Sequence, residues 1–318
     1  MLTLRETELH SPAIDEVCIQ VEASGVTLAD VMARKGKPHP GSPRIPLVLG
    51  FEIAGTIIQV GAGVTGLAVG QRVIAVVPSG GYSSHICVET WRCIPLPDEV
   101  DGIPAVALVI NYWTAWHILH RASHLQPGQR VLVHGISGGV GTALAQLGHL
   151  SELKMYGTAS ANKHNFVRTL NVTPIDYRRD DFVAQIGKLT GDGVDLVIDP
   201  IGGSNWSRSY RTLRKGGRLL LTGIQSLAEK PNRALLPSAL QMLFLGILPD
   251  SKSIRFVGLI PEKRRDSYHE DLIQLVTYLV EGKINPVISR TFPLSSAVEA
   301  HRYLENGKAV GKLVLTPD

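Results

Sequence analysis

A glycine-rich stretch near the middle of the chain has the pattern of a phosphate-binding loop. The segment VLVHGISGGVGTALAQLG (131–148) starts as an apolar run, turns on glycines and continues with residues that favour a helix. Backbone N–H groups at a helix start, with the positive end of the helix dipole, bind pyrophosphate, and small residues let the phosphate approach the backbone. The predicted contacts are the residues of the turn, namely Ser137, Gly138, Gly139 and Val140.

This loop departs from the common GxGxxG pattern. Gly138 and Gly141 match its last two glycines, whereas Ile136 stands at the first. A glycine pattern alone is a weak signal, and a glycine turn that binds no ligand is the alternative. The strand-like run before the loop, the helix after it and the alternating segments that follow favour a dinucleotide site.

The end of the next strand-like segment indicates which dinucleotide binds. An NAD site places Asp or Glu there, against the ribose 2′-hydroxyl, but the segment KMYGTASANK (154–163) contains no acid. Hydroxyl and cationic side chains would instead attract a 2′-phosphate, and we therefore predict NADPH. For Lys163 the alternative is a solvated lysine at a helix start. The predicted contacts are the residues that end this segment and the next, namely Thr158, Ala159, Ser160, Lys163, Tyr177 and Arg178.

The elements around this loop predict that it lies on a parallel sheet. From about residue 103 onwards, strand-like and helix-like segments alternate. Such alternation implies right-handed crossovers and a parallel sheet with helices on both faces. We therefore predict an α/β fold with a Rossmann doubly wound domain over 108–261. The expected strands are 130–135, 154–159, 173–177, 194–200, 218–223 and 253–260, and the expected helices are 139–150, 162–170, 180–190 and 204–217.

The region before residue 103 has a different pattern. Between residues 14 and 100, short β-branched segments are separated by Gly and Pro, which indicates a small barrel-like β domain. An amphipathic helix is expected within 268–284, and a final strand at 311–316 is expected to return to the first domain. That domain is therefore predicted to be discontinuous, with residues 1–107 and 262–318.

The composition is that of an ordinary globular protein. The chain has 318 residues, 44% of them hydrophobic and 19% charged, and its net charge of +4 does not argue for nucleic acid. The start of the chain has no apolar signal core, so we expect a cytoplasmic protein. The chain has an odd number of cysteines, Cys18, Cys87 and Cys93, and no CxxC motif. This fits a reducing compartment in which all three are buried thiols.

The order of these motifs resembles the medium-chain dehydrogenase/reductases. QPGQRVLVHGISGGVG followed by GTASANKH is similar to the zinc-free quinone oxidoreductases, and LVINYWTAWHIL, DLVIDPIGGS and AVGKLVL resemble the vesicle amine transport protein homologues among them. The resemblance covers nearly the whole chain. It implies a GroES-like β-barrel catalytic domain beside the Rossmann domain. Members usually carry one more strand before EVCIQVEASGV (16–26), so we expect the β domain to lack an edge strand.

The zinc-binding positions of the family are replaced in this chain. The family's zinc enzymes bind the metal through Cys in GxCxxD and His in GHE, whereas this chain has GVTLAD and GFE, with Thr27 and Phe51 at those positions. Phe has no lone pair and Thr is a poor ligand for zinc. We therefore expect no metal. Glu52, which follows Phe51, is expected to anchor backbone or a neighbouring basic group, and Asp30 is expected to pair with Arg34.

The resemblance implies that NADPH reduces a quinone or the C=C bond of an enone. Thr114, Gly223 and Ile224 match residues beside the nicotinamide. The substrate pocket is expected between the domains, lined by Phe51, Trp113, Met242 and Phe244. Tyr82 is the best side-chain candidate for the proton donor, but packing is its more common role and solvent is an alternative donor.

The apolar segment 253–260 is expected to be an edge strand that joins two chains into a homodimer. The main alternative function is that of a NADPH-binding interaction protein or vesicle-associated factor with little turnover.

Overall fold

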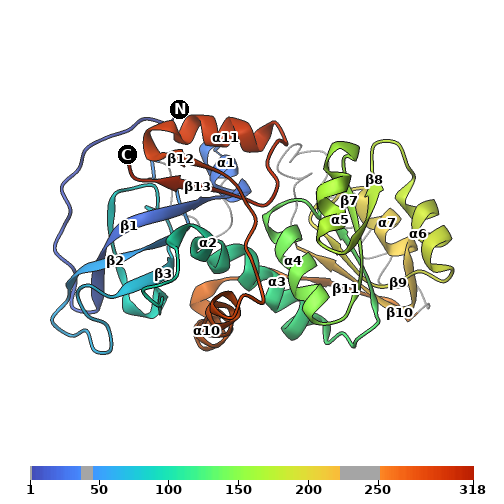
Figure 1. The fold of residues 1–318 in the computed structure, drawn as a ribbon, viewed down its shortest axis with the longest axis horizontal. Coiled ribbons are helices and arrows are strands. Elements are labelled where there is room, and N and C mark those ends of the chain that lie inside the picture. The colour runs from blue at the N-terminus through green and yellow to red at the C-terminus, as the bar shows by residue number, and fades with distance from the viewer. Residues whose placement is uncertain (1, 37–45, 223–250) are drawn as a thin grey trace. The chain divides into compact units, whose positions relative to one another are not determined.

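The chain forms two compact units, and one of them is discontinuous in sequence. The computed structural model describes residues 2–36, 46–222 and 251–318. Unit 1 comprises residues 1–113 and 261–318, and unit 2 comprises residues 114–260. Figure 1 shows the chain leaving unit 1 for unit 2 and then returning to unit 1.

Unit 2 is built on a six-stranded sheet whose strands all pair in parallel. The strand order is β11-β10-β9-β6-β7-β8, and the reversal between β6 and β9 is typical of doubly wound folds. Figure 1 shows helices α4 and α5 on one face of the sheet and α6 and α7 on the other. The elements are β6 (Arg130–His134), α4 (Gly139–Leu150), β7 (Lys154–Ala159), α5 (His164–Thr169), β8 (Val172–Asp176), α6 (Phe182–Thr190), β9 (Val194–Asp199), α7 (Asn205–Arg211), β10 (Leu213–Leu221) and β11 (Ser253–Phe256).

The predicted parallel sheet is confirmed, but one predicted helix is wrong in part. Helix α7 ends at Arg211, whereas we expected helix as far as residue 217. Leu213 already pairs with Val194, and the register shifts before Arg218 pairs with Leu196. The side chain of Leu213 is buried in the core of the unit, and this burial favours strand over helix. The last strand also ends earlier than expected, at Phe256.

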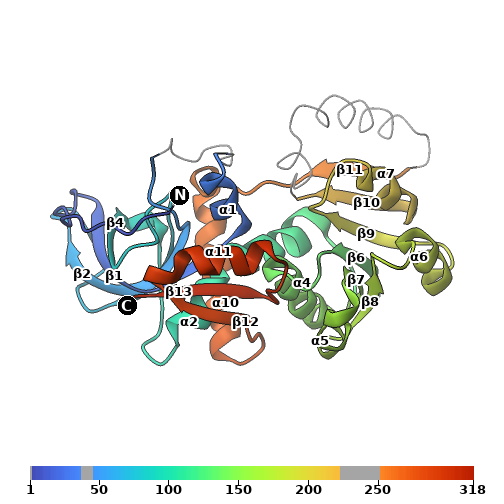
Figure 2. The same cartoon turned by 90° about the horizontal axis from the view of Figure 1, so that it is seen from above.

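Unit 1 is built on a seven-stranded, mostly antiparallel sheet. Its main path is β12-β13-β1-β2-β3-β5, and β4 pairs with β1. As predicted, the last strand returns to the first domain, because Ser24 of β1 pairs with Leu315 of β13. Figure 2 shows β12, β13 and α11 together in this unit. The elements are β1 (Glu16–Val26), α1 (Leu28–Arg34), β2 (Glu52–Val60), β3 (Arg72–Val76), β4 (His85–Glu89), β5 (Cys93–Pro95), α2 (Gly102–Ala107), α10 (Arg265–Val280), β12 (Ile288–Pro293), α11 (Ala297–Glu305) and β13 (Lys312–Thr316).

A continuous apolar helical segment follows β5. It contains α2, α3 (Trp113–Trp116) and wide π-helical turns at Leu108–Tyr112 and His117–Ser123. In length and hydropathy, residues Gly102–Ser123 could cross a membrane, yet 72% of the most apolar part is buried inside the structure. Such burial is typical of a core helix.

The structure corrects the expectation of three thiols. Cys18 and Cys87 form a disulfide. The two residues are 69 positions apart in sequence, but they lie directly opposite each other on the antiparallel strands β1 and β4. This cross-strand pairing brings their side chains together. Cys93 is a free thiol, and burial raises its pKa to about 12.

Candidate functional site

The loop between β6 and α4 presents backbone N–H groups at the start of a helix. Gly135 has a φ of +72°, a left-handed conformation that favours glycine. Gly138 is the N-cap residue, and no side chain of the described residues caps this helix. The N–H groups of the first helical turn are therefore available to an anion.

Two glycines of this loop differ in whether the structure has room for a side chain at their position. A Cβ added to Gly138 would lie 3.4 Å from the nearest atom, the Gly135 oxygen, which is ordinary contact. A Cβ added to Gly141 would lie 2.5 Å from the Ile136 oxygen, so Gly141 permits the tight turn itself. No other atom of the described residues lies within 4 Å of the Cβ position at Gly138, so the space beside Gly138 is open. The loop therefore fits the pyrophosphate of a dinucleotide.

Ile136, which broke the glycine pattern, has a structural explanation. Its side chain is fully buried and lies against Gly157 of β7, where a Cβ would be 2.5 Å from the Ile136 Cβ. The missing side chain at Gly157 makes room for the extra one at Ile136. The sequence signal was a glycine inside an apolar strand, which often marks a close approach.

The residues that end β7 divide into buried and accessible ones. Thr158 and Ala159 are 4% and 3% exposed, and the Thr158 hydroxyl accepts a hydrogen bond from the Gly135 N–H at 3.2 Å. These two side chains support the loop from inside. Ser160 and Lys163 are half-buried, and the Ser160 hydroxyl donates to the Asn162 amide oxygen at 2.6 Å.

Two cations, Lys163 and Arg178, follow the ends of the adjacent strands β7 and β8. Burial lowers the pKa of Lys163, and the positive charge of Arg178 lowers this pKa further. The Arg178 guanidinium lies 5.6 Å from the centre of the Tyr177 ring, and Tyr177 is 52% exposed. Two cations that repel each other beside an anion-binding loop favour an anionic ligand group. A half-buried lysine with a cationic neighbour differs from the solvated lysine of the alternative interpretation.

Unit 1 holds a buried charged cluster formed by Asp30, Glu52 and Lys312, none of which is more than 2% exposed. Glu52 forms an ion pair with Lys312, and its other oxygen accepts a hydrogen bond from the Ile110 N–H at 3.0 Å. The expectation that Glu52 anchors backbone and a basic group is therefore confirmed. Burial lowers the pKa of Lys312 to about 7, an effect that the charge of Asp30 opposes.

The expected Asp30–Arg34 pair is wrong. Asp30 accepts hydrogen bonds from the Thr27 hydroxyl at 2.6 Å and from the Gly50 N–H at 2.8 Å. Thr27 and Asp30 form a capping box at the start of α1, which directs the carboxylate away from the helix surface. Arg34 instead pairs with Glu305 of α11.

Tyr82 is half-buried and packs against an apolar cluster of unit 1. Its hydroxyl lies 3.1 Å from Nε2 of His301. Burial and the negative charge of Asp30 raise the pKa of Tyr82 well above its ordinary value. These contacts favour the packing role over that of a proton donor.

The buried His301 should make the stability of unit 1 depend on pH. Burial and the nearby Arg34 lower the pKa of His301 from 6.5 to about 4. As the pH falls from 6.5 towards 4, the unfolded chain binds this proton and the folded chain does not, so the free energy of unfolding should decrease by roughly 1–3 kcal/mol. His301→Gln, which keeps a polar partner for Tyr82, should reduce this pH dependence in urea unfolding at about pH 7 and about pH 4.5. An equal pH dependence in both proteins would contradict the assignment.

The residues predicted to contact the substrate or the nicotinamide differ in how far they are buried. Trp113 is 2% exposed, and its indole N–H donates to Asp271 at 3.2 Å. Its ring lies 5.0 Å from that of Tyr268, so Trp113 is a core residue of unit 1 and not a wall of a pocket. Phe51 and Thr114 are half-buried. Four further predicted residues, Gly223, Ile224, Met242 and Phe244, lie outside the described residues.

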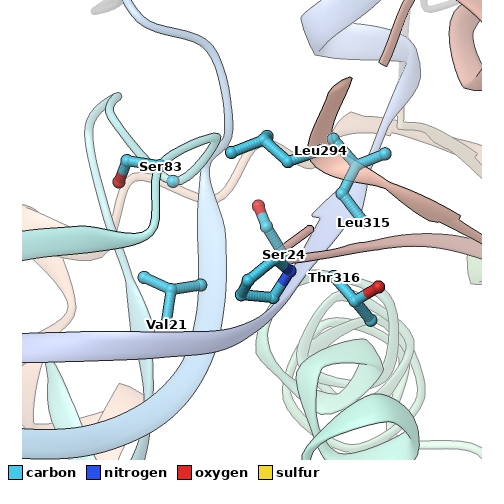
Figure 3. Close-up of a pocket in the computed structure, with 8 residues that line it drawn as sticks. Val21, Ser24, Ser83, Leu294, Leu315 and Thr316 are labelled. Carbon is cyan, nitrogen blue, oxygen red and sulfur yellow. The ribbon is translucent and has the colours of Figure 1, made fainter. Parts of the chain in front are cut away.

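The described residues form no metal cluster, and the cavity found in unit 1 is small. Among the described residues, no three His, Cys, Asp or Glu side chains are placed to hold a metal ion. Figure 3 shows a cavity in unit 1 where Val21, Ser24 and Leu315 face one another. Its volume of about 10 Å³ is enough for at most one water molecule.

Comparison with known proteins places both units in one superfamily. Residues 13–98 match the alcohol dehydrogenase GroES-like domain, and residues 172–315 match the zinc-binding dehydrogenase family. The chain is 33% identical over 316 residues to the synaptic vesicle membrane protein VAT-1 homolog of Rattus norvegicus, covering 96% of this chain and 78% of the relative. It is 30% identical over 321 residues to a 2-haloacrylate reductase of Burkholderia sp, covering 98% of this chain and 94% of the relative.

A solved structure shows the same fold. The quinone oxidoreductase of Escherichia coli, in complex with NADPH, superposes with a TM-score of 0.89 at 26% identity and covers 98% of this chain and 95% of that one. Its similarity extends over both units. The chain therefore belongs to the medium-chain dehydrogenase/reductase superfamily of oxidoreductases, alongside the VAT-1 homologues and the quinone oxidoreductases.

Proposed function

We propose that this protein is a zinc-independent, NADPH-dependent reductase that acts on quinones or on the C=C bond of enones. The proposal rests on two basic residues, Lys163 and Arg178, which follow the adjacent strands β7 and β8 at the same edge of the sheet as the loop after β6. A 2′-phosphate would attract both cations, whereas the uncharged 2′-hydroxyl of NADH would not. Similarity to a quinone oxidoreductase crystallised with NADPH supports the same cofactor.

The residues of unit 2 bind and orient the cofactor in this proposal. The uncapped start of α4 binds the pyrophosphate, with Ser137 to Val140 forming the turn. Ser160, Lys163, Tyr177 and Arg178 surround the adenine ribose phosphate. Thr114 is retained as a contact that would orient the nicotinamide. When bound, NADPH supplies the hydride, and the protein contributes orientation and electrostatics.

Two residues of unit 1 support zinc independence. Zinc needs thiolate, imidazole or carboxylate ligands, usually three of them at a catalytic site. Thr27 uses its hydroxyl in the capping box with Asp30, and Phe51 has no donor atom. Glu52, the remaining carboxylate beside Phe51, is paired with Lys312. We propose that Phe51 gives the substrate an apolar contact and that solvent supplies the proton.

Lys163→Ala should weaken NADPH binding by about tenfold or more and leave NADH binding nearly unchanged. A hydrogen bond to a charged group contributes about 1.5–3 kcal/mol, which corresponds to at least tenfold in affinity. Arg178→Ala should act in the same direction. Calorimetric titration with each nucleotide measures both effects. Arg168→Ala, on an exposed face of α5, is the matched control that should change neither affinity. Equal weakening of NADPH and NADH by Lys163→Ala would count against the proposed cofactor.

We also propose a homodimer that forms through β11. This strand is at the edge of the unit 2 sheet, and its residue Phe256 is 63% exposed. An exposed edge strand with apolar side chains is a template for pairing with another chain. Sedimentation at micromolar concentration should show a dimer, and Phe256→Lys should shift it towards monomer. A monomeric unmodified protein would rule the interface out.

A second candidate function is that of a NADPH-binding protein with little turnover that acts through interactions. The similarity to a protein named for the synaptic vesicle membrane favours it. NADPH consumption with a panel of ortho-quinones and enones separates the two. Tight NADPH binding without turnover of any of them would favour the second function.

A further inference from the structure

A buried chain of polar groups runs from the phosphate-binding loop to the end of β9. His134, the last residue of β6, is 4% exposed. Its Nδ1 lies 3.1 Å from the Thr158 hydroxyl oxygen, and its Nε2 lies 2.9 Å from the Ser209 hydroxyl oxygen. At one end of the chain, Thr158 accepts from the Gly135 N–H. At the other end, Ser209 donates to the Asp199 carboxylate at 2.7 Å.

The donors and acceptors in this chain allow one arrangement of protons with a neutral imidazole. A carboxylate accepts only, so the Ser209 hydrogen is directed at Asp199 and the Ser209 oxygen accepts from Nε2–H of His134. Nδ1 of the neutral ring is then an acceptor. The Thr158 hydroxyl donates to Nδ1, and its oxygen is left to accept from Gly135. Burial lowers the pKa of His134 and so favours this neutral form.

The Asp199 end of the chain is firmly held. One carboxylate oxygen accepts from the backbone N–H groups of Ile201 at 2.8 Å and Gly202 at 3.2 Å. The other accepts from the Asn205 amide at 2.9 Å as well as from Ser209. Asp199 is fully buried, so these bonds are sheltered from water.

The opposite end of the chain holds the residue that opens the phosphate-binding loop. Gly135 takes the left-handed conformation from which the loop turns towards Gly138. Thr158 makes two hydrogen bonds to the start of this loop. Its backbone oxygen accepts one from the Ile136 N–H at 3.3 Å, and its hydroxyl oxygen accepts one from the Gly135 N–H. When His134 accepts its hydrogen, the hydroxyl is fixed in the orientation in which its oxygen faces the Gly135 N–H.

We propose that His134, acting through Thr158, is a positioning residue for the phosphate-binding loop. Cofactor affinity then depends on the tautomer of a buried side chain that has no contact with the cofactor. The inference rests on the proposed function, because it assumes that this loop binds NADPH.

The experiment uses the full chain and four variants. Thr158→Val removes the hydroxyl at nearly constant volume, and Thr158→Ser keeps it. In place of His134, the Asn amide oxygen matches the accepting Nδ1, and the Gln amide nitrogen matches the donating Nε2. Calorimetry measures the Kd for NADPH and for NADH, thermal unfolding without nucleotide measures stability, and ¹⁵N NMR reports the tautomer of His134.

We expect Thr158→Val and His134→Gln to weaken the binding of NADPH and of NADH by about tenfold each, which corresponds to the loss of one hydrogen bond. Thr158→Ser and His134→Asn should stay within about threefold of the unmodified protein, since each keeps the link to Gly135. The equal effect on the two nucleotides distinguishes this role from that of Lys163. NMR should show hydrogen on Nε2.

Two results would overturn the inference alone: hydrogen on Nδ1, or Thr158→Val and His134→Gln proteins that melt earlier yet bind both nucleotides as tightly as the unmodified protein. Failure of the unmodified protein to bind NADPH would overturn the proposed function, and the inference with it.

Discussion

Replacing Lys312 with methionine should destabilise unit 1 by about 3–5 kcal/mol. The substitution keeps most of the side-chain volume but removes the ammonium group that neutralises Glu52. Glu52 would then be a fully buried carboxylate whose remaining hydrogen bond comes from Ile110. Such a charge is costly unless it becomes protonated. Urea unfolding followed by circular dichroism measures the loss.

The double variant Glu52→Gln/Lys312→Met is the matched control. It removes both charges, and replacing a buried ion pair by neutral groups of similar volume is often nearly neutral in stability. We therefore expect it to recover most of the stability that the single variant loses. If the double variant is as unstable as Lys312→Met, packing rather than charge is the reason for the loss.

Gly138→Ala should weaken NADPH and NADH binding by about 10- to 100-fold without destabilising the protein. The new methyl group has room in the protein, with its nearest neighbour at 3.4 Å, but it fills the space that we assign to the pyrophosphate. Loss of one charged hydrogen bond, or two, accounts for this range. Calorimetric titration gives the affinity, and thermal unfolding gives the stability.

Gly141→Ala is the comparison, three residues further along the same loop. Its methyl group would lie 2.5 Å from the backbone oxygen of Ile136, so the turn itself must shift. We expect this variant to lower the unfolding temperature as well as the affinity. If Gly138→Ala binds nucleotides normally, the loop does not hold the pyrophosphate as proposed.

The parts of the fold that could be predicted are those encoded locally. The apolar run of β6, the glycines after it and the helix α4 are adjacent in sequence, and the predicted helix bounds agree with Gly139–Leu150. The parallel sheet followed from the alternation of strands and helices. The predicted helix runs beyond the observed end of α7 at Arg211, because the sequence has no helix-breaking residue between Arg211 and Gly216.

The parts that could not be predicted depend on residues distant in sequence. The Cys18–Cys87 bond needs the register of β1 on β4, and the fit of Ile136 needs its position opposite Gly157. Trp113 is an aromatic residue of the kind that often lines pockets. In the structure its indole N–H instead donates a hydrogen bond to Asp271, which belongs to the C-terminal segment of unit 1. The buried links of His134 likewise come from β7 and α7. Sequence spacing carries no direct signal for such pairs.

The discontinuity of unit 1 has a consequence for the order in which the newly made chain folds on the ribosome. Unit 2 is one uninterrupted segment, so it can fold as soon as its last strand has emerged. Unit 1 must wait for β13, and Glu52 is synthesised 260 residues before the lysine that neutralises it. During that interval the edge of β1 that pairs with β13 in the folded protein is exposed. A chaperone that binds exposed strand edges would therefore act on the nascent chain chiefly at unit 1.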